Sequence, residues 1–328
     1  MRPGLGHLGR GVSMRFRGSH KILAGFVLFT LFVAVFGACA LSQDTPQVNI
    51  IPRFRPTPGR REPSIRLDVK MVMIPANVTD KNDHPVMDLH RENFHVFEDA
   101  VEQKIESFSI DQAPVSLGIV FDASGSMRNK IDKSFTAVEQ FLKTSLPGDE
   151  YFLVQFSDVP KLRTPFTPDT DEIVTNLSLI RPEGWTAMFD AIYVAVNQMR
   201  LAKNPRKALL ILSDGGDNNS RYSGGEVINL LREADVRVFA IGLFDNARYL
   251  KKAAEDTGGA MVSVHNINDL PDAVDKLSSQ LRSQYLLGYY PVKPQNDGKF
   301  HKVKVLVSQA ADSLKLHTSW RHGYYAPY

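Results

Sequence analysis

VSLGIVFDASGSM, residues 115–127, is the stretch that decides the fold of this chain. Its first part, 117–121, is a short and almost unbroken apolar run, which is typical of a parallel strand buried on both faces. The run stops at Asp122, and Ser124 and Ser126 follow on either side of a glycine. The sequence therefore predicts a buried strand that ends in a tight turn rich in side-chain oxygens.

The oxygen atoms of this turn are typical of a site for a hard divalent cation. Neither Cys nor His stands among them, and oxygen ligands alone favour Mg²⁺, Mn²⁺ or Ca²⁺ over Zn²⁺. The pattern D-x-S-x-S is also common in plain loops and helix N-caps, because Asp and Ser both bond to nearby backbone groups. Two later stretches favour the metal site over the plain loop.

Each of the two later stretches lies at the end of a predicted helix or strand. Thr186 follows Gly184 and Trp185 just before a predicted helix, and LLILSDGGD at 209–217 is a second buried strand that ends in an aspartate. In this order the motifs resemble those of the von Willebrand factor type A domain, whose metal-ion-dependent adhesion site uses D-x-S-x-S, then a Thr, then an Asp. The resemblance implies a ligand set of Asp122, Ser124, Ser126, Thr186 and Asp214.

The same resemblance implies a binding function. Mg²⁺ is the expected cofactor, with Mn²⁺ or Ca²⁺ as alternatives, and one coordination position is left for an outside ligand. Because a hard cation prefers a carboxylate, the expected partner is a protein that presents an Asp or Glu. Trp185 and Asp217 are candidate contacts at the rim of the site. Burial of Trp185 against the first helix and simple solvation of Asp217 are equally compatible with the sequence.

Two other functions stay open. A structural or assembly component of the cell envelope would keep the fold with an incidental metal. A metal-dependent hydrolase would use the cation to activate water, but the chain has no G-x-S-x-G, H-E-x-x-H or G-x-x-x-x-G-K-[ST] motif and no general base placed beside the turn. His265 and the other histidines are scattered. We therefore expect a binding module and no enzyme.

Composition supports a folded, exported protein. The chain has 328 residues, which is enough for two domains. Hydrophobic residues make up 43% and charged residues 23%, a composition typical of globular proteins. The formal charge of +3 would be −2 without the five basic residues before position 41, so it gives no case for nucleic-acid binding. These residues are Arg2, Arg10, Arg15, Arg17 and Lys21.

The first 41 residues predict a signal peptide or membrane anchor. An apolar segment at 22–37 follows the basic residues and runs into Ala38-Cys39-Ala40, which has the form of a signal-peptidase site. The 20 residues of 22–41 would also span a bilayer if uncleaved, and Cys39 offers a third possibility, lipid attachment. All three place the rest of the chain in the periplasm, the cell envelope or the medium, with membrane contact only through this segment. Because Cys39 is the only cysteine, the mature chain has no disulfide, which suits a bacterial envelope protein.

The remaining chain divides into four further segments. Prolines and arginines at 42–64 predict an extended linker. Strict alternation from 65 to 71 starts a strand-rich segment that runs to 112, and a second one covers 285–328. Because neither has enough strands to close a core alone, we expect them to form one small β-sandwich. A von Willebrand factor type A domain at 113–284 would be inserted between them.

The inserted segment alternates between α and β patterns. Apolar stripes predict helices near 131–142, 189–199 and 270–281, while strands are expected at 151–156 and 236–241. This alternation is typical of an α/β fold with a doubly wound, mostly parallel sheet. Such sheets bind ligands beyond the carboxyl ends of their strands, which is where Asp122 and Asp214 stand.

The order of motifs along the whole chain resembles a narrower group, the von Willebrand factor A-related proteins abundant in acidobacteria. The matching motifs are F-x-V-x-E-D at 94–99, YLLGYYP at 285–291 and G-Y-Y-A-P at 323–327. Ala100 departs from the glycine expected after Glu-Asp in that group, and this puts the geometry of the predicted turn in doubt.

Overall fold

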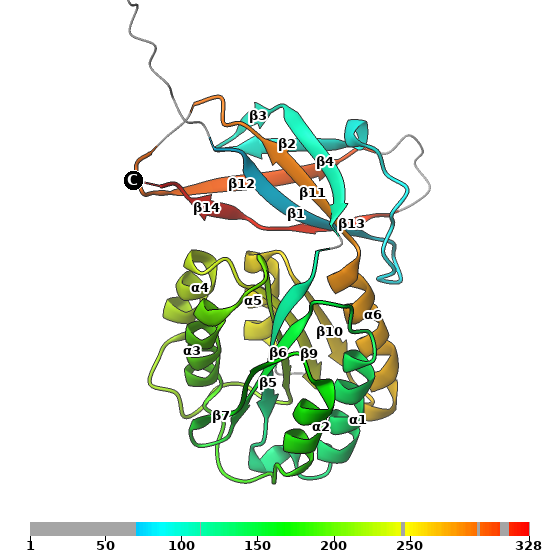
Figure 1. Cartoon of the computed structure of the whole chain (residues 1–328), viewed down its shortest axis with the longest axis vertical. Helices are drawn as coiled ribbons and strands as arrows, with labels where there is room; N and C mark the ends of the chain where they lie inside the picture. Colours follow the sequence, from blue (N-terminus) through cyan, green and yellow to red (C-terminus); the bar gives the residue numbers. More distant parts are fainter. Residues whose placement is uncertain (1–69, 112, 244–246, 294–295, 309–314, 328) are drawn as a thin grey trace, which may run out of the picture. The chain divides into compact units, whose positions relative to one another are not determined.

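The structure is a computed structural model that describes most of the chain after the predicted linker (Figure 1). The expected export leader (1–41) and the linker (42–64) lie outside the described residues. None of the helices in the described part combines the length and apolar character needed to cross a membrane. The described residues are 70–111, 113–243, 247–293, 296–308 and 315–327.

A six-stranded sheet forms the centre of the α/β part. Its first five strands are parallel, and the edge strand β7 runs antiparallel to β6. The predicted fold class is therefore confirmed. In spatial order the strands are β10 (Ala260–Val264), β9 (Arg237–Leu243), β8 (Arg206–Ser213), β5 (Val115–Asp122), β6 (Glu150–Phe156) and β7 (Pro160–Thr167).

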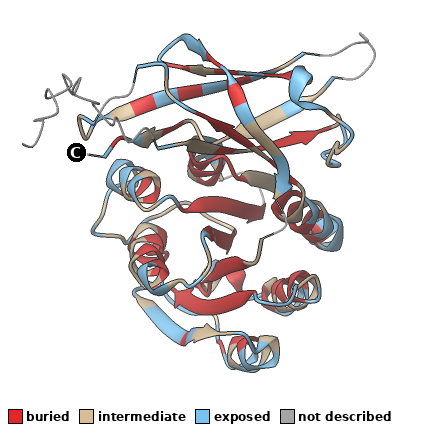
Figure 2. Cartoon of the chain, turned by 45° about the horizontal axis from the view of Figure 1, so that its top comes forward, coloured by how far each residue is buried: buried red, intermediate tan, exposed pale blue. Residues whose placement is uncertain are grey.

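Helices cover both faces of this sheet (Figure 1). Leu117, Ile119 and Phe121 of β5 point into one core, while Val120 points into the other. Every residue of β5 is buried, which explains why this strand reads as a continuous apolar run (Figure 2). One face carries α1 (Ile131–Leu142), α2 (Thr170–Ser178) and α6 (Leu270–Arg282), and the other carries α3 (Met188–Gln198), α4 (Gly224–Glu233) and α5 (Arg248–Thr257).

Local sequence explains several helix ends. Ser223 and Glu226 form a capping box at the start of α4. Pro271 lies in the first turn of α6, where its missing N–H costs nothing, and Gly258 ends α5 in the left-handed conformation at φ 72°. Four short 3₁₀ turns complete the helical elements: η1 (Arg91–Asn93), η2 (Gly125–Met127), η3 (Met199–Leu201) and η4 (Ile267–Asp269).

Two four-stranded antiparallel sheets form a sandwich from both ends of the described chain. Their shared core includes Ile74, Val96, Tyr285 and Val305. The first described strand begins at Val72, and most of the alternating segment at 65–71 lies outside the described residues. One sheet has the order β13 (His317–Trp320), β1 (Val72–Thr79), β11 (Gln284–Tyr289), β4 (Ile105–Asp111), and the other β14 (Gly323–Tyr325), β12 (Phe300–Val307), β2 (Phe94–Glu98), β3 (Val101–Gln103).

The chain leaves and re-enters the sandwich at one place. Asp111, the last residue of β4, pairs with Gln284, the first residue of β11. Arg206 forms an ion pair with Asp111 at 3.2 Å, and Arg237 donates a hydrogen bond to the Gln284 amide oxygen. Burial lowers the pKa of Arg237 to about 10. Two arginines from the central sheet therefore hold this junction.

Candidate functional site

The candidate site lies where two neighbouring parallel strands end. Asp122 is the last residue of β5, and Asp214 directly follows the last residue of β8. β6, the next strand along the chain, lies on one side of β5, and β8 lies on the other. The order in which strands are added to the sheet therefore changes direction at β5. The two carboxylates lie on either side of this point. Open α/β sheets place their ligand crevices at such a point.

Direct contacts link four of the five predicted ligands. The Ser124 Oγ lies 3.0 Å from the Ser126 Oγ, which donates a hydrogen bond of 2.8 Å to Asp214 Oδ1. Asp122 Oδ1 accepts the backbone N–H of Ser124 at 2.8 Å, and Oδ2 accepts the Ser213 hydroxyl at 2.5 Å. Residues 88 positions apart in the sequence thus meet at one edge of the sheet.

Asp122 is the most deeply buried member of the group, with no exposed surface. Burial raises the pKa of its carboxyl above 3.8, and the neighbouring Asp214 carboxylate adds to this effect. Hydrogen bonds from Ser213 and Ser124 oppose the shift. A buried carboxylate in such a position is stabilised in its charged form by a nearby cation.

Thr186 lies on a loop that is bonded to the first turn. Gly125 donates its backbone N–H to the Gly184 carbonyl at 3.0 Å, and Glu183 donates to the Ala123 carbonyl at 2.8 Å. These bonds hold the loop before α3 against the D-x-S-x-S turn.

On its other side, Thr186 is held by the loop that follows β8. Its N–H donates to Asn218 Oδ1 at 2.9 Å, and its carbonyl accepts from the Asn218 N–H at 3.0 Å. Thr186 is 5% exposed. It is thus fixed between the loops that carry the other predicted ligands, through its backbone and not through a bond from its hydroxyl to Asp122 or Asp214.

Gly184 shapes the same loop. Its φ is 76°, in the left-handed region, and an added Cβ would lie 2.5 Å from Asp158 Oδ2. Asp158 Oδ1 in turn accepts the Trp185 N–H at 2.7 Å. The loop therefore requires glycine at this position.

The two predicted rim residues differ in their surroundings. Trp185 is 66% exposed, so its ring lies at the surface and is not buried against the first helix. The Asp217 carboxylate accepts the N–H groups of Phe189 and Ser220 at 3.0 and 3.2 Å. Asp217 therefore caps the start of α3 instead of standing in solvent.

Sequence reasoning missed two residues of this site. Lys130 pairs its ammonium with Asp214 Oδ2, and the two side chains are 21% and 2% exposed. Nothing in the sequence distinguished Lys130 from a solvated lysine before a helix. Ser213, which bonds to Asp122, did carry a signal, since it is a polar residue at the end of a buried apolar strand.

The donor set suits a hard cation. All five predicted ligands carry oxygen, and a positively charged group, the Lys130 ammonium, already lies against Asp214. The Asp122 and Asp214 carboxylates lie at the same edge of the sheet. The arrangement can therefore hold a small divalent cation through side-chain oxygens, with chemistry that matches the preferences of Mg²⁺.

Comparison with known proteins gives one family and a set of similar folds. Residues 117–216 match the family model described as von Willebrand factor type A domain. Comparison with curated proteins returned no match. A solved von Willebrand factor type A structure from Catenulispora acidiphila is similar over 80% of this chain and 75% of its own, with 12% identity and a TM-score of 0.48.

Two crystal forms of proximal thread matrix protein 1 from the mussel byssus are also similar. One covers 55% of this chain and 49% of its own, and the other 56% and 51%, both at 19% identity, with TM-scores of 0.46 and 0.47. This chain thus spans about half the length of the mussel protein. The family match, in contrast, runs from β5 to the loop after β8 and includes every predicted ligand.

Proposed function

The chain carries a von Willebrand factor type A domain, and we propose that it is an exported protein-binding module that depends on a divalent cation. Asp122, Ser124 and Ser126 hold the cation from the first turn, and Thr186 and Asp214 complete its ligand set. The vacant coordination position takes an Asp or Glu side chain of a partner protein. Export rests on the leader expected at 1–41.

The spacing of the oxygen atoms is the observation that carries this proposal. In octahedral Mg²⁺ coordination, with bonds of about 2.1 Å, adjacent ligands lie about 3.0 Å apart. Ser124 Oγ and Ser126 Oγ are separated by 3.0 Å, and Ser126 Oγ and Asp214 Oδ1 by 2.8 Å. The spacing therefore suits Mg²⁺ or the similar Mn²⁺.

Charge supports an acidic partner. Asp122 and Asp214 together balance the two positive charges of the cation, while hydroxyl ligands add none. A nearly neutral site accepts an incoming carboxylate without repulsion, and neutral ligands keep the cation a strong electrophile. When the cation binds, it takes over the contact that the Lys130 ammonium makes with Asp214.

The exposed Trp185 ring offers the partner an apolar contact beside the cation. Aromatic side chains contribute strongly to binding when a partner removes them from water. Asp217 contributes by fixing the start of α3, through the N–H of Phe189. Trp185 thus adds to the affinity for the partner, and Asp217 keeps the start of α3 in place.

Calorimetric titration of Mg²⁺ into the full-length chain tests the metal site. Mild detergent keeps the apolar segment at 22–41 in solution. We expect one Mg²⁺ per chain, and at least about tenfold weaker binding in Asp122→Ala and Ser126→Ala, because each removes one oxygen ligand. Asp132→Asn, on the exposed side of α1, is the matched control and should leave the affinity unchanged. Equal affinity in all four proteins would contradict the proposal.

Capture of partners from an envelope extract tests the binding role. The tagged chain should retain a protein in Mg²⁺ and release it in EDTA. Trp185→Ala should lose much of the partner while keeping its Mg²⁺ affinity. Capture that does not respond to EDTA would instead favour a structural component with an incidental metal.

A further inference from the structure

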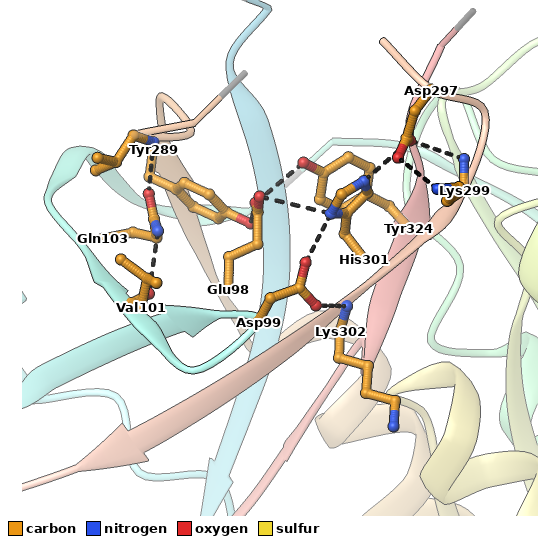
Figure 3. Close-up of polar contacts among 11 residues, drawn as sticks. Glu98, Asp99, Val101, Gln103, Tyr289, Asp297, Lys299, His301, Lys302 and Tyr324 are labelled. Atoms are coloured by element: carbon orange, nitrogen blue, oxygen red, sulfur yellow. Dashed lines mark hydrogen bonds and ion pairs between the residues drawn. The ribbon is translucent and has the colours of Figure 1, made fainter. Parts of the chain in front are cut away.

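A second cluster of ionisable side chains lies in the β-sandwich, away from the residues discussed above. Glu98 ends β2, Asp99 follows in the turn to β3, and His301 lies in β12 (Figure 3). One ligand atom from each of the three lies within 4.8 Å of the other two. We propose that these side chains form a second metal site, which takes Zn²⁺. This inference does not depend on the proposed function.

The distances around His301 suit a small cation. Its Nδ1 lies 2.8 Å from Asp99 Oδ2 and 3.9 Å from Glu98 Oε1. In tetrahedral Zn²⁺ coordination, with bonds of about 2.05 Å, ligand atoms are about 3.3 Å apart. The observed distances lie on either side of this value. Small side-chain rotations therefore bring the three atoms to coordinating positions.

The outer oxygens of both carboxylates are already taken. Glu98 Oε2 accepts hydrogen bonds from the hydroxyls of Tyr289 at 2.6 Å and Tyr324 at 3.0 Å. Asp99 Oδ1 accepts the backbone N–H of Lys302 at 3.0 Å. Each carboxylate is thus anchored by one oxygen and offers the other to His301, as in Figure 3.

The other imidazole nitrogen is held in the way that metal-binding histidines usually are. His301 Nε2 lies 3.2 Å from Asp297 Oδ1. A carboxylate on the distal nitrogen fixes the ring and its tautomer, and leaves the near nitrogen to the metal. Zn²⁺ therefore replaces the proton on Nδ1, which leaves to solvent, while Nε2 keeps its proton toward Asp297.

Burial and ligand type favour Zn²⁺ over Mg²⁺ at this cluster. The side chains of Glu98 and His301 are 7% and 5% exposed, whereas Asp99 is 48% exposed. The open side at Asp99 gives the ion a path in and leaves a fourth position for water. An imidazole beside two carboxylates suits Zn²⁺, while Mg²⁺ prefers oxygen ligands alone. The Lys302 side chain extends away from these carboxylates (Figure 3).

The test is Zn²⁺ titration into the full-length chain in detergent, with Mg²⁺ at saturating concentration so that oxygen-only sites are filled. We expect one Zn²⁺ per chain and a rise in the thermal midpoint of unfolding. Asp99→Asn and His301→Gln should weaken Zn²⁺ binding at least about a hundredfold, because each removes a ligand. Asp297→Asn should weaken it about tenfold to a hundredfold.

His95→Gln is the matched control. His95 lies on the same strand, β2, and its Nδ1 is 2.9 Å from Glu102 in an exposed pair. The control should keep the wild-type affinity. Absence of saturable Zn²⁺ binding, or binding lost in His95→Gln but kept in Asp99→Asn, would overturn the proposal. Because Asp99 is half-exposed, its variant is expected to fold even if His301→Gln does not, and circular dichroism checks this.

Discussion

The ammonium of Lys130 pairs with the Asp214 carboxylate across 84 residues of sequence, at the edge where β5 and β8 end. The side chain of Asp214 is almost fully buried, so this pair is shielded from water. In the proposed metal site, a divalent cation would compete with this lysine for the same carboxylate. Lys130 would thereby set how readily the site accepts a metal.

Lys130→Met should therefore bind Mg²⁺ about tenfold more tightly than the wild type, since a competing positive charge is removed. Without Mg²⁺ the variant should be less stable by about 3 kcal/mol, because Asp214 is left buried without its partner. Calorimetry and denaturant unfolding, each with and without Mg²⁺, measure both effects. Lys133→Met, three residues further along in the first turn of α1, removes an equal charge and should change neither. Weaker binding in Lys130→Met would show that the lysine assists the metal.

Gly184→Ala should damage the site from outside the ligand set. The new Cβ would meet the Asp158 side chain at 2.5 Å, and φ 76° is strained for alanine. We expect a loss of about 1 to 3 kcal/mol of stability together with weaker Mg²⁺ binding. Gly225→Ala, which has no atom within 4 Å of its Cβ, is the control and should be neutral or slightly stabilising. Unaltered Mg²⁺ affinity in Gly184→Ala would show that this loop does not hold the ligands.

Ala100→Gly should stabilise the protein. Ala100 has φ 69° in the turn from β2 to β3, where a side chain is disfavoured. Glycine relieves this strain, and the net gain should be about 0.5 to 1 kcal/mol by chemical denaturation. Ala202→Gly, at φ −60°, should instead lose a similar amount. Destabilisation by both substitutions would contradict the strained turn.

Acid should weaken the protein through Asp149. Although burial alone would raise its pKa, bonds from Arg282 and the N–H groups of Leu146 and Val115 hold the pKa below 3.8. A depressed folded pKa contributes stability above the unfolded value, and this contribution is lost as the pH falls from about 4 through the folded pKa.

Asp149→Asn should accordingly lose about 3 kcal/mol at pH 7, because Arg282 keeps a buried charge without its partner. The difference from the wild type should shrink below pH 4. Unfolding free energies measured from pH 7 to pH 3 check this, with Asp132→Asn as the exposed control. A difference that stays constant over this range would rule out the Asp149 contribution.

The sequence predicted the strands that carry the site better than it predicted the contacts between the site residues. The run before Asp122 and the one before Asp214 identified two buried strands, because strands buried on both faces must be apolar throughout. The structure adds that these strands are neighbours, which brings the two carboxylates to the same edge. Which strands lie side by side depends on the topology of the sheet, and the periodicity of the sequence does not encode it.

The helices show the same limit. The stripes of α1, α3 and α6 were strong enough to predict, whereas α2, α4 and α5 were not recognised. The capping box at Ser223 and Glu226 was a readable signal for α4. In the sandwich, the cluster around His301 depends on the register of β12 against β2, in which Val303 faces Glu98. A shift of one residue would turn His301 to the other face, so the sequence alone could not predict the cluster.

The junction at Asp111 and Gln284 has a mechanical consequence. Both connections to the inserted α/β part leave from one end of a single pair of antiparallel strands. If a bound partner pulls on that part, the load enters the sandwich through β4 and β11 together, at this one end. Arg206 and Arg237, which contact Asp111 and Gln284, carry part of that tension alongside the two backbone connections.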